Sequence, residues 1–158
     1  MFVQLFADLR VTRYLALTDD LMQPGWAVSA LDRIVTCWKR YGYGPFTAIH
    51  KERGHWIGRI GLMVHEDWPG EDKTEVGWLL DPEFWSRGLA TEGGTAAIHH
   101  GFAVLDLSRI ISVTTLKNVA SWRVMQKCCL MHQGMIRWRD VDCVWYSADK
   151  DEWLSQQR

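Results

Sequence analysis

The chain has 158 residues, of which 47% are hydrophobic and 23% are charged, and its formal net charge is −1. This length suits one domain with one sizeable core, so we expect residues 1–158 to form a single domain. The balanced charge excludes a broad electrostatic attraction to nucleic acid or to a membrane surface, and we expect neither as a partner.

The first part of the chain predicts helices followed by a hairpin. Residues 2–9 indicate one or two helical turns and are too short for a signal peptide or a membrane span. A helix is predicted over residues 26–41, ended by Gly42. Residues 46–50 and 56–65 have the pattern of two strands joined by a turn. The predicted helix has one apolar face: Val28, Leu31, Ile34, Val35 and Trp38.

The second part alternates strands and helices. Residues 74–81 predict a strand in which apolar residues alternate. A helix from about Thr91 to Leu105 follows, then a strand over residues 109–116 and a helix from Asn118, a good N-cap, to about Cys128. Two strands near residues 135–138 and 142–148 end the chain. The order predicts a mixed α/β domain built on a largely antiparallel sheet.

The turn at residues 85–93 joins the strand to the helix and contains Gly88. Glycine allows the backbone to approach a ligand closely. The first N–H groups of a helix lack intrahelical partners and lie at the positive end of its dipole. This combination favours binding of an anion, and the turn therefore predicts a phosphate-bearing ligand.

Two segments, Glu75–Glu92 and Asn118–Lys127, resemble the two acyl-CoA motifs of the GNAT superfamily, in the order and separation typical of its ribosomal-protein N-terminal acetyltransferase branch. The resemblance implies a twisted, mixed, mostly antiparallel sheet flanked by helices. Parallel central strands 74–81 and 109–116 would splay apart around the pantetheine of acetyl-CoA. It implies an acetyl-CoA-dependent N-acetyltransferase in which a primary amine attacks the thioester directly.

The same resemblance assigns a cofactor site, and the residues themselves lead us to expect no metal. A backbone N–H near Leu79 or Leu80, where the family strand bulges, would hold the oxyanion. His99 and His100 are adjacent and therefore point to different helix faces, which argues against a joint metal site. The residues expected to bind acetyl-CoA are Leu79, Leu80, Arg87, Gly88, Leu89, Ala90, Thr91, Asn118 and Lys127.

Amine acetylation also needs a base for the ammonium and a proton for the leaving thiolate. We predict Glu75 as the base, with Asp81 and His65 behind it; the alternative is that Glu75 is a solvated edge-strand carboxylate. For the thiolate we predict Ser121, since the second motif offers no tyrosine. The alternative role for Ser121 is to support the helix cap at Asn118.

Two features depart from the family pattern. Cys129 replaces the glycine that usually ends the second-motif helix, so either a left-handed residue carries a side chain or the helix closes differently. The family's first strand, which would precede Phe6, has no counterpart. We therefore expect an N-terminally short domain with an open sheet edge, which a homodimer could cover; a mis-assigned start codon is the alternative.

Four cysteines without metal-ligand spacing (Cys37, Cys128, Cys129, Cys143) indicate reduced thiols and a cytoplasmic protein.

The acceptor amine is not specified by these motifs. A protein N-terminus, an amino acid, a polyamine-like metabolite and an amine antibiotic all remain open, as does a non-catalytic CoA-binding module. A generic nucleotide-phosphate binder ranks lower because no complete P-loop is present. Six acidic residues either attract a cationic amine or form a solvated loop: Asp19, Asp20, Glu66, Asp67, Glu71 and Asp72. Six aromatic residues either line a pocket or belong to the core: Trp26, Trp38, Tyr41, Tyr43, Trp56 and Trp68.

Overall fold

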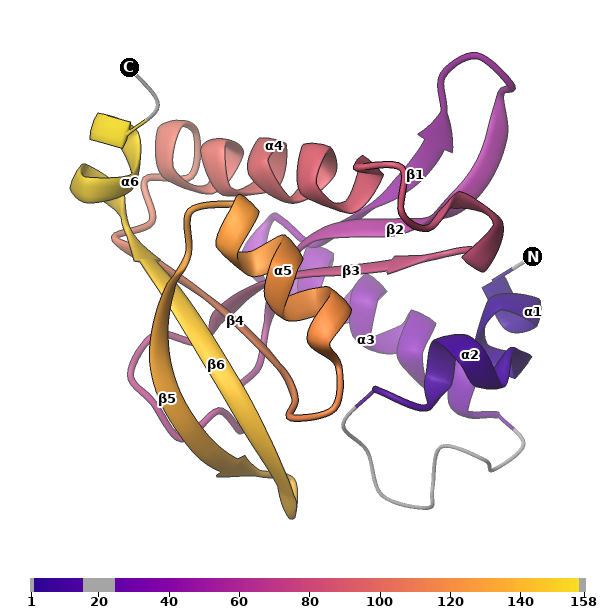
Figure 1. The fold of residues 1–158 in the computed structure, drawn as a ribbon, viewed down its shortest axis with the longest axis horizontal. Helices are drawn as coiled ribbons and strands as arrows, with labels where there is room; N and C mark the ends of the chain where they lie inside the picture. The colour runs from indigo at the N-terminus through magenta and orange to yellow at the C-terminus, as the bar shows by residue number, and fades with distance from the viewer. Residues whose placement is uncertain (1, 16–24, 157–158) are drawn as a thin grey trace.

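The computed structural model describes residues 2–15 and 25–156 (Figure 1). Its helices are α1 (Phe2–Ala7), α2 (Leu9–Thr12), α3 (Trp26–Tyr41), the short 3-10 helix η2 (Pro82–Phe84), α4 (Leu89–Ala103), α5 (Val119–Lys127) and α6 (Lys150–Gln156). Its strands are β1 (Pro45–His50), β2 (His55–Val64), β3 (Thr74–Leu80), β4 (Arg109–Thr115), β5 (Met131–Trp138) and β6 (Val141–Asp149). None of the described helices is long and apolar enough to cross a membrane.

The strands form a six-stranded sheet in the order β1-β2-β3-β4-β6-β5. Every neighbouring pair is antiparallel except β3 and β4, which are parallel. These two strands are in register at a single pair, Glu75 with Ile111, and then diverge. The predicted fold class, including the splayed parallel strands in a mostly antiparallel sheet, is confirmed.

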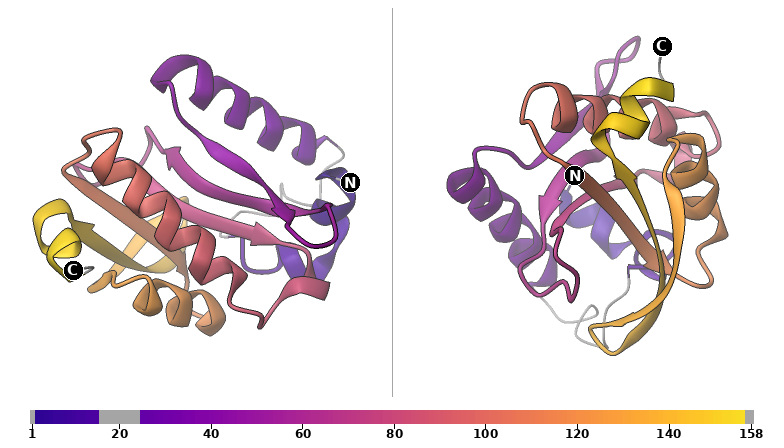
Figure 2. Two further views of the ribbon diagram at one scale, coloured as in Figure 1. Left: turned by 90° about the horizontal axis from the view of Figure 1, so that it is seen from above. Right: turned by 90° about the vertical axis from the view of Figure 1, so that its left-hand side faces the viewer.

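Helices cover both faces of the sheet (Figure 2). Side chains alternate between the faces of a strand. On β3, Val76 packs in the main core with residues of α4, whereas Leu79 packs with residues of α1 and α3. The sheet thus separates α3 and the N-terminal helices from α4 and α5, and the gap between β3 and β4 connects the two sides.

Small residues set α4 close to the sheet. A Cβ on Gly93 would lie 2.5 Å from Cδ1 of Ile60, and one on Gly101 would lie 2.6 Å from Cδ1 of Ile110. A side chain at either position would therefore require Ile60 or Ile110 to move. This close packing fixes the position of the N-terminus of α4, at the turn predicted to bind an anion.

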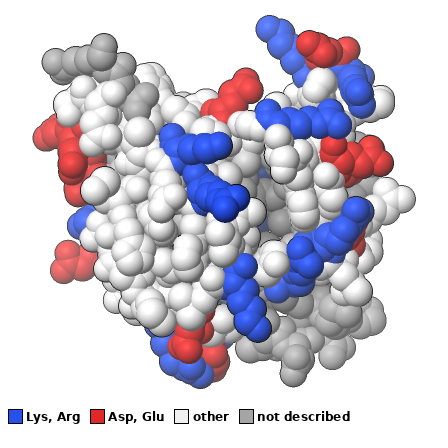
Figure 3. All heavy atoms as spheres, in the orientation of Figure 1, with Lys and Arg blue, Asp and Glu red and all other residues white. Residues whose placement is uncertain are grey.

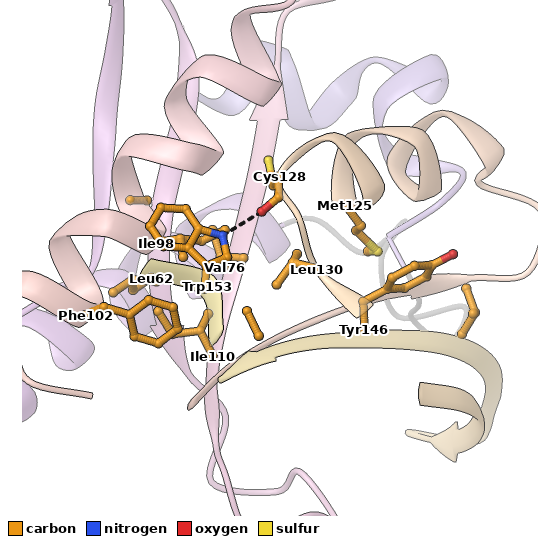
Figure 4. Close-up of a cluster of buried hydrophobic side chains, with 13 residues drawn as sticks. Leu62, Val76, Ile98, Phe102, Ile110, Met125, Cys128, Leu130, Tyr146 and Trp153 are labelled. Carbon is orange, nitrogen blue, oxygen red and sulfur yellow. Dashed lines mark hydrogen bonds between the residues drawn. The ribbon is translucent and has the colours of Figure 1, made fainter. Parts of the chain in front are cut away.

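The main core lies under α4, α5 and α6 (Figure 4). Trp153 of α6 is 1% exposed, and its Nε1 donates a hydrogen bond of 2.8 Å to the carbonyl of Cys128, at the end of α5. Its ring also packs against Phe102 of α4, with the centroids 5.7 Å apart. Helix α6 was not predicted, because seven residues carry too little periodicity to signal a helix.

Two other predictions need correction. Strand β5 begins at Met131 rather than near residue 135, because its alternation is weak: Met131 and Met135 are both exposed, and the register shifts between His132 and Gly134. The apolar face predicted for α3 points largely to solvent, since Ala30 and Cys37 are the residues that this helix buries. The exposed members of that face are Val28, Leu31, Val35 and Trp38.

Helix α5 ends in a left-handed residue that carries a side chain, which is the first of the two alternatives given above for Cys129. Cys129 has φ +59°. Its N–H donates to the carbonyl of Gln126, and the N–H of Leu130 donates to that of Met125, which together form a Schellman motif. The cysteine therefore preserves the usual helix end, at a cost of about 1–2 kcal/mol for a side chain in this conformation.

Buried thiols predict an alkaline loss of stability. Burial raises the pKa of Cys143 to about 11, with Glu75 and Asp142 adding to the shift, and burial also raises the pKa of Cys128. The unfolded chain releases these protons near the ordinary value of about 8.5. Stability should therefore be full below pH 8.5 and fall as the pH rises towards 11. Urea unfolding between pH 7.5 and 10.5 measures this; Cys143→Ala should flatten the decline, and an unchanged slope would contradict the assignment.

Candidate functional site

One cavity passes through the gap between β3 and β4 and has a volume of about 800 Å³. At one end it is lined by the turn before α4 and by α5. At the other it is lined by α2, α3 and the beginning of the β5–β6 turn. In Figure 3 the surface is hollowed between the α5 and α2 regions, and Lys and Arg side chains border the hollow.

The turn before α4 has the geometry of an anion cradle. Gly88 is the N-cap of α4 in left-handed conformation, with φ +80°. Glu92 makes the first intrahelical bond, to Gly88, which leaves the N–H groups of the three preceding residues without partners in the helix. The helix begins at Leu89, two residues earlier than predicted. All five predicted turn residues line the cavity: Arg87, Gly88, Leu89, Ala90 and Thr91.

The turn is tied to the end of β3. Nε1 of Trp85 donates a bond of 2.7 Å to the carbonyl of Leu80. The carboxylate of Asp81 accepts a bond of 2.9 Å from the N–H of Glu83 and so caps η2. Asp81, predicted as a reserve base, therefore has a structural role and is not among the residues that line the cavity.

Backbone alternation decides which of the two predicted leucines faces the gap. Ser112 Oγ, on β4, donates a bond of 2.9 Å to the carbonyl of Val76, and the carbonyl of Leu80 accepts a bond from Trp85. The backbone N–H and C=O groups of the even-numbered residues of β3 therefore point away from β2. The Leu80 N–H therefore faces the gap, whereas that of Leu79 faces β2. The bulge expected near these residues is absent, since the β2–β3 register is continuous; the irregular register lies between β1 and β2 at Ala48 and Ile49.

The N-terminus of α5 forms a connected polar group beside the gap. Asn118 caps the helix: its Oδ1 accepts from the N–H of Ser121 at 3.3 Å, and its Nδ2 donates to Thr114 Oγ1 and to Ser121 Oγ. Ser121 Oγ also accepts a bond of 3.3 Å from Nε1 of Trp78. Two N–H donors thus hold this oxygen in place, and its own proton is available to a bound group. Lys127 lines the same end of the cavity.

Glu75 lies at the point where β3 and β4 separate. One carboxylate oxygen is 2.6 Å from Nε2 of His65, and the other accepts a bond of 3.3 Å from the N–H of Val113 on β4. The side chain is 16% exposed, so the alternative of a solvated edge-strand carboxylate is wrong. The structure joins Glu75 and His65, which were predicted as first-choice and reserve base, into one pair.

His65 is held on its other side as well. Its ring packs edge-on against Trp138, with the centroids 4.9 Å apart, and its Nδ1 is 3.4 Å from Nη2 of Arg139. Arg139 is fixed by two bonds to Asp67, of 2.6 and 2.9 Å, and this arginine lowers the pKa of Asp67. A neutral His65 that donates from Nε2 to Glu75 satisfies this arrangement, because Nδ1 then presents a lone pair to Arg139.

The acidic residues predicted near the acceptor lie elsewhere or are already paired. Asp19 and Asp20 lie outside the described residues. Glu66 accepts hydrogen bonds from Tyr41 and Lys73, and Asp67 pairs with Arg139. Among the described residues, none of the remaining four lines this cavity: Glu66, Asp67, Glu71 and Asp72.

Of the predicted aromatic residues, Trp26 lines the cavity, whereas Trp68 is buried in a separate core cluster. Several residues that line the end of the cavity beside α2 and α3 were not predicted from the sequence. They come from separate elements, and no shared motif signals their convergence: Tyr14, Arg33, Arg59, Trp138 and Arg139.

His99 and His100 diverge, as expected for neighbours on a helix. His99 lies near Trp153 and His100 near Phe46. Within residues 2–15 and 25–156, no group of three or more His, Cys, Asp or Glu side chains is placed to hold a metal ion.

Comparisons with known proteins point to one family. Residues 1–130 match the model described as Acetyltransferase (GNAT) domain. The uncharacterized N-acetyltransferase YnaD of Bacillus subtilis (strain 168) is 30% identical over 102 residues, which span 60% of this chain and 59% of YnaD. The match therefore covers less than two thirds of that relative's length.

Solved structures share the fold. An acetyltransferase from Agrobacterium tumefaciens str. C58 aligns with a TM-score of 0.80 at 21% identity, covering 93% of this chain and 82% of that one. Aminoglycoside acetyltransferase AAC(6')-Ib in complex with coenzyme A aligns with a TM-score of 0.74 at 16% identity, covering 98% and 91%. At these identities the likeness establishes a common architecture.

Proposed function

This chain belongs to the GNAT acetyltransferase family, and we propose that it transfers the acetyl group of acetyl-CoA to a primary amine by direct attack on the thioester. One observation carries the proposal: the anion cradle before α4 and the Glu75–His65 pair line a single cavity that passes between the splayed strands. A cofactor bound by its phosphates at one end can therefore present its thioester to an amine at the other.

The cofactor would bind by its phosphates and by the strand edge. The free N–H groups of Leu89, Ala90 and Thr91 would hold the pyrophosphate, with Arg87 and Lys127 adding positive charge. Pantetheine would lie along the gap, where the even-numbered residues of β3 present backbone groups. Asn118 would support this end by fixing Ser121, since both its amide donors and its oxygen are already bonded within the protein.

The chemistry then needs three groups. Glu75 would accept the proton of the substrate ammonium, directly or through a water, so that the nitrogen lone pair can attack the thioester carbon. The N–H of Leu80 would stabilise the developing oxyanion. As the C–S bond breaks, Ser121 would donate a proton to the departing thiolate and regain one from the nitrogen of the intermediate, which loses its extra proton as the neutral amide forms. Holding amine and thioester together supplies much of the rate.

A non-catalytic CoA-binding module is the alternative, and it would be favoured if Cys129 broke the usual end of α5. The Schellman hydrogen bonds around Cys129 are present, which supports the catalytic proposal. Thiol release from acetyl-CoA over a panel of amines tests the proposal directly. Steady turnover with at least one amine is expected; a chain that binds CoA but turns over no amine would overturn it.

Arg87→Glu should weaken CoA binding by about tenfold to a hundredfold, because it removes a charge-assisted contact and adds repulsion. The Arg87 guanidinium lies 5.3 Å from the Phe84 ring and has no ion pair among the described residues, so the fold should survive. Calorimetry with CoA measures the effect. Arg53→Glu, in the exposed β1–β2 turn, is the matched control; equal affinities of the two variants would count against the cradle.

A further inference from the structure

The acceptor end of the cavity is strongly basic, although the whole chain carries a net charge of −1. Arg33 comes from α3, Arg59 from β2 and Arg139 from the turn after β5. Among the described residues that line the cavity, Glu75 is the one carboxylate. The concentration of positive charge is therefore local to this end and cannot be inferred from composition.

Arg59 is the most informative of these side chains. It lies opposite Leu79 in the β2–β3 register and so shares the face that α1 and α3 cover. Its Nε is buried without a hydrogen-bond partner in the described chain. Burial lowers the pKa of Arg59, and Arg33 lowers it further, while Glu75 opposes the shift. A buried guanidinium with an unused donor is costly unless an anion meets it.

Arg33 adds to the positive electrostatic potential at this end of the cavity. It has no carboxylate partner within the described residues; its guanidinium lies 5.7 Å from the Trp26 ring. Burial is the largest cause that lowers the pKa of Arg33, and the charge of Arg139 is the second. The three arginines therefore act on one region. Arg139 is bonded to Asp67 and Arg10 to Asp8. Among the described arginines that line this end, Arg13, Arg33 and Arg59 have no carboxylate partner, and of these Arg33 and Arg59 interact electrostatically with each other.

Gly77 keeps the floor of this space open. It lies between Glu75 and Leu79 on the same face of β3. A Cβ at this position would have only the Glu75 carboxylate within 4 Å, at 3.8 Å from Oε2. An acceptor can therefore lie over Gly77 with one end at Glu75 and the other towards Arg59. Because Glu75 is negative and Arg59 is positive, this space distinguishes the amine end of a ligand from an anionic end.

We propose that the acceptor is a small amine that also carries an anionic group, a carboxylate or a phosphate, bound by Arg59 and Arg33 while its amine faces Glu75. This rests on the proposed acetyl transfer. The arginine fork matches the oxygens of either anion in a bidentate way. The same positive potential disfavours an ammonium, so it also increases the fraction of uncharged, nucleophilic amine.

Matched amine pairs test the proposal with acetyl-CoA at saturation. Tryptophan and tryptamine, histidine and histamine, and lysine and cadaverine differ by a carboxylate; phosphoethanolamine and ethanolamine, and glucosamine 6-phosphate and glucosamine, differ by a phosphate. We expect kcat/KM for the anionic member of at least one class to exceed that of its partner by about tenfold or more. The class that does so identifies the anion.

Turnover in which the uncharged or cationic partners equal or exceed the anionic members in every pair would overturn this inference and leave acetyl transfer standing. Absence of turnover with every amine would overturn both. The two failures are therefore distinguishable in one assay.

Variants locate the effect. Arg59→Gln and Arg33→Gln should lower kcat/KM for the preferred anionic amine by about 10- to 100-fold more than they lower it for the non-anionic partner, and leave CoA affinity unchanged. Arg59→Lys should retain part of the preference, and Arg53→Gln is the exposed control. If Arg59→Gln does not fold, the Arg33→Gln variant still tests the proposal, because Arg33 is exposed and its replacement should not prevent folding. An unchanged anionic preference in folded Arg33→Gln would refute the assignment.

Discussion

Replacement of Glu75 by Gln should lower kcat/KM for the acceptor amine by about 10²- to 10⁴-fold at neutral pH, because the amide cannot accept the ammonium proton. Gln keeps the size of the side chain but has one acceptor oxygen, so it can accept a hydrogen bond from His65 or from Val113 and not from both. We therefore expect a small loss of stability beside the chemical defect, and little change in CoA affinity. It should shrink as the pH approaches the pKa of the amine, where the substrate supplies its own neutral form.

Steady-state kinetics from pH 6.5 to 10, with calorimetry for CoA, measure this prediction. Glu52→Gln, in the exposed β1–β2 turn, controls for the loss of one carboxylate. His65→Gln tests the positioning role: it should lower kcat/KM less than Glu75→Gln does and leave CoA binding intact. A Glu75→Gln enzyme with wild-type kcat/KM would show that the proton leaves by another route, and Ser121 and Leu80 would remain to be tested separately.

Replacement of Trp153 by Ala should lower the free energy of unfolding by about 3–5 kcal/mol, the usual cost of removing a buried indole. The side chain is 1% exposed and joins α6 to the end of α5 and to α4. Its loss leaves a cavity and an unpaired Cys128 carbonyl. The end of α5 should loosen too, so CoA affinity should fall although Trp153 does not line the cavity.

Urea unfolding followed by circular dichroism measures the change. Trp153→Phe is the matched variant, since it keeps a ring in the core and loses the indole donor; we expect a smaller loss, of about 1–3 kcal/mol. Val104→Ala, at a side chain that is 66% exposed, should stay within about 0.5 kcal/mol of the parent. If the alanine variant at 153 lost less than 1 kcal/mol, the C-terminal helix would not be a necessary part of this core.

Local pattern was sufficient to predict the secondary structure at the proposed cofactor end of the cavity. The strand–turn–helix at residues 74–103 depends on alternation, on Gly88 and on an N-terminus of a helix, which neighbouring residues specify together. Asn118 and the three residues that follow it likewise indicate a helix N-cap. For the same reason the helix ends were accurate to a few residues, and the identification of the family rested on segments that are contiguous in the chain.

Packing decided the acceptor end. The sequence could not show that α3 turns Ala30 and Cys37 inward and leaves Val28 and Leu31 exposed, because the larger apolar side chains indicate the opposite orientation. Neither could it place α6, whose seven residues acquire their position from Trp153 in a core made by other elements.

The sequence by itself determined the fold family, the anion cradle and the candidates Glu75 and Ser121, because each rests on residues close together in the chain. Only the tertiary structure paired Glu75 with His65, chose Leu80 over Leu79 for the gap, and brought Arg33 and Arg59 to the same space. Strand register and helix docking set these juxtapositions, and they arise from contacts between residues far apart in sequence, which no local pattern records.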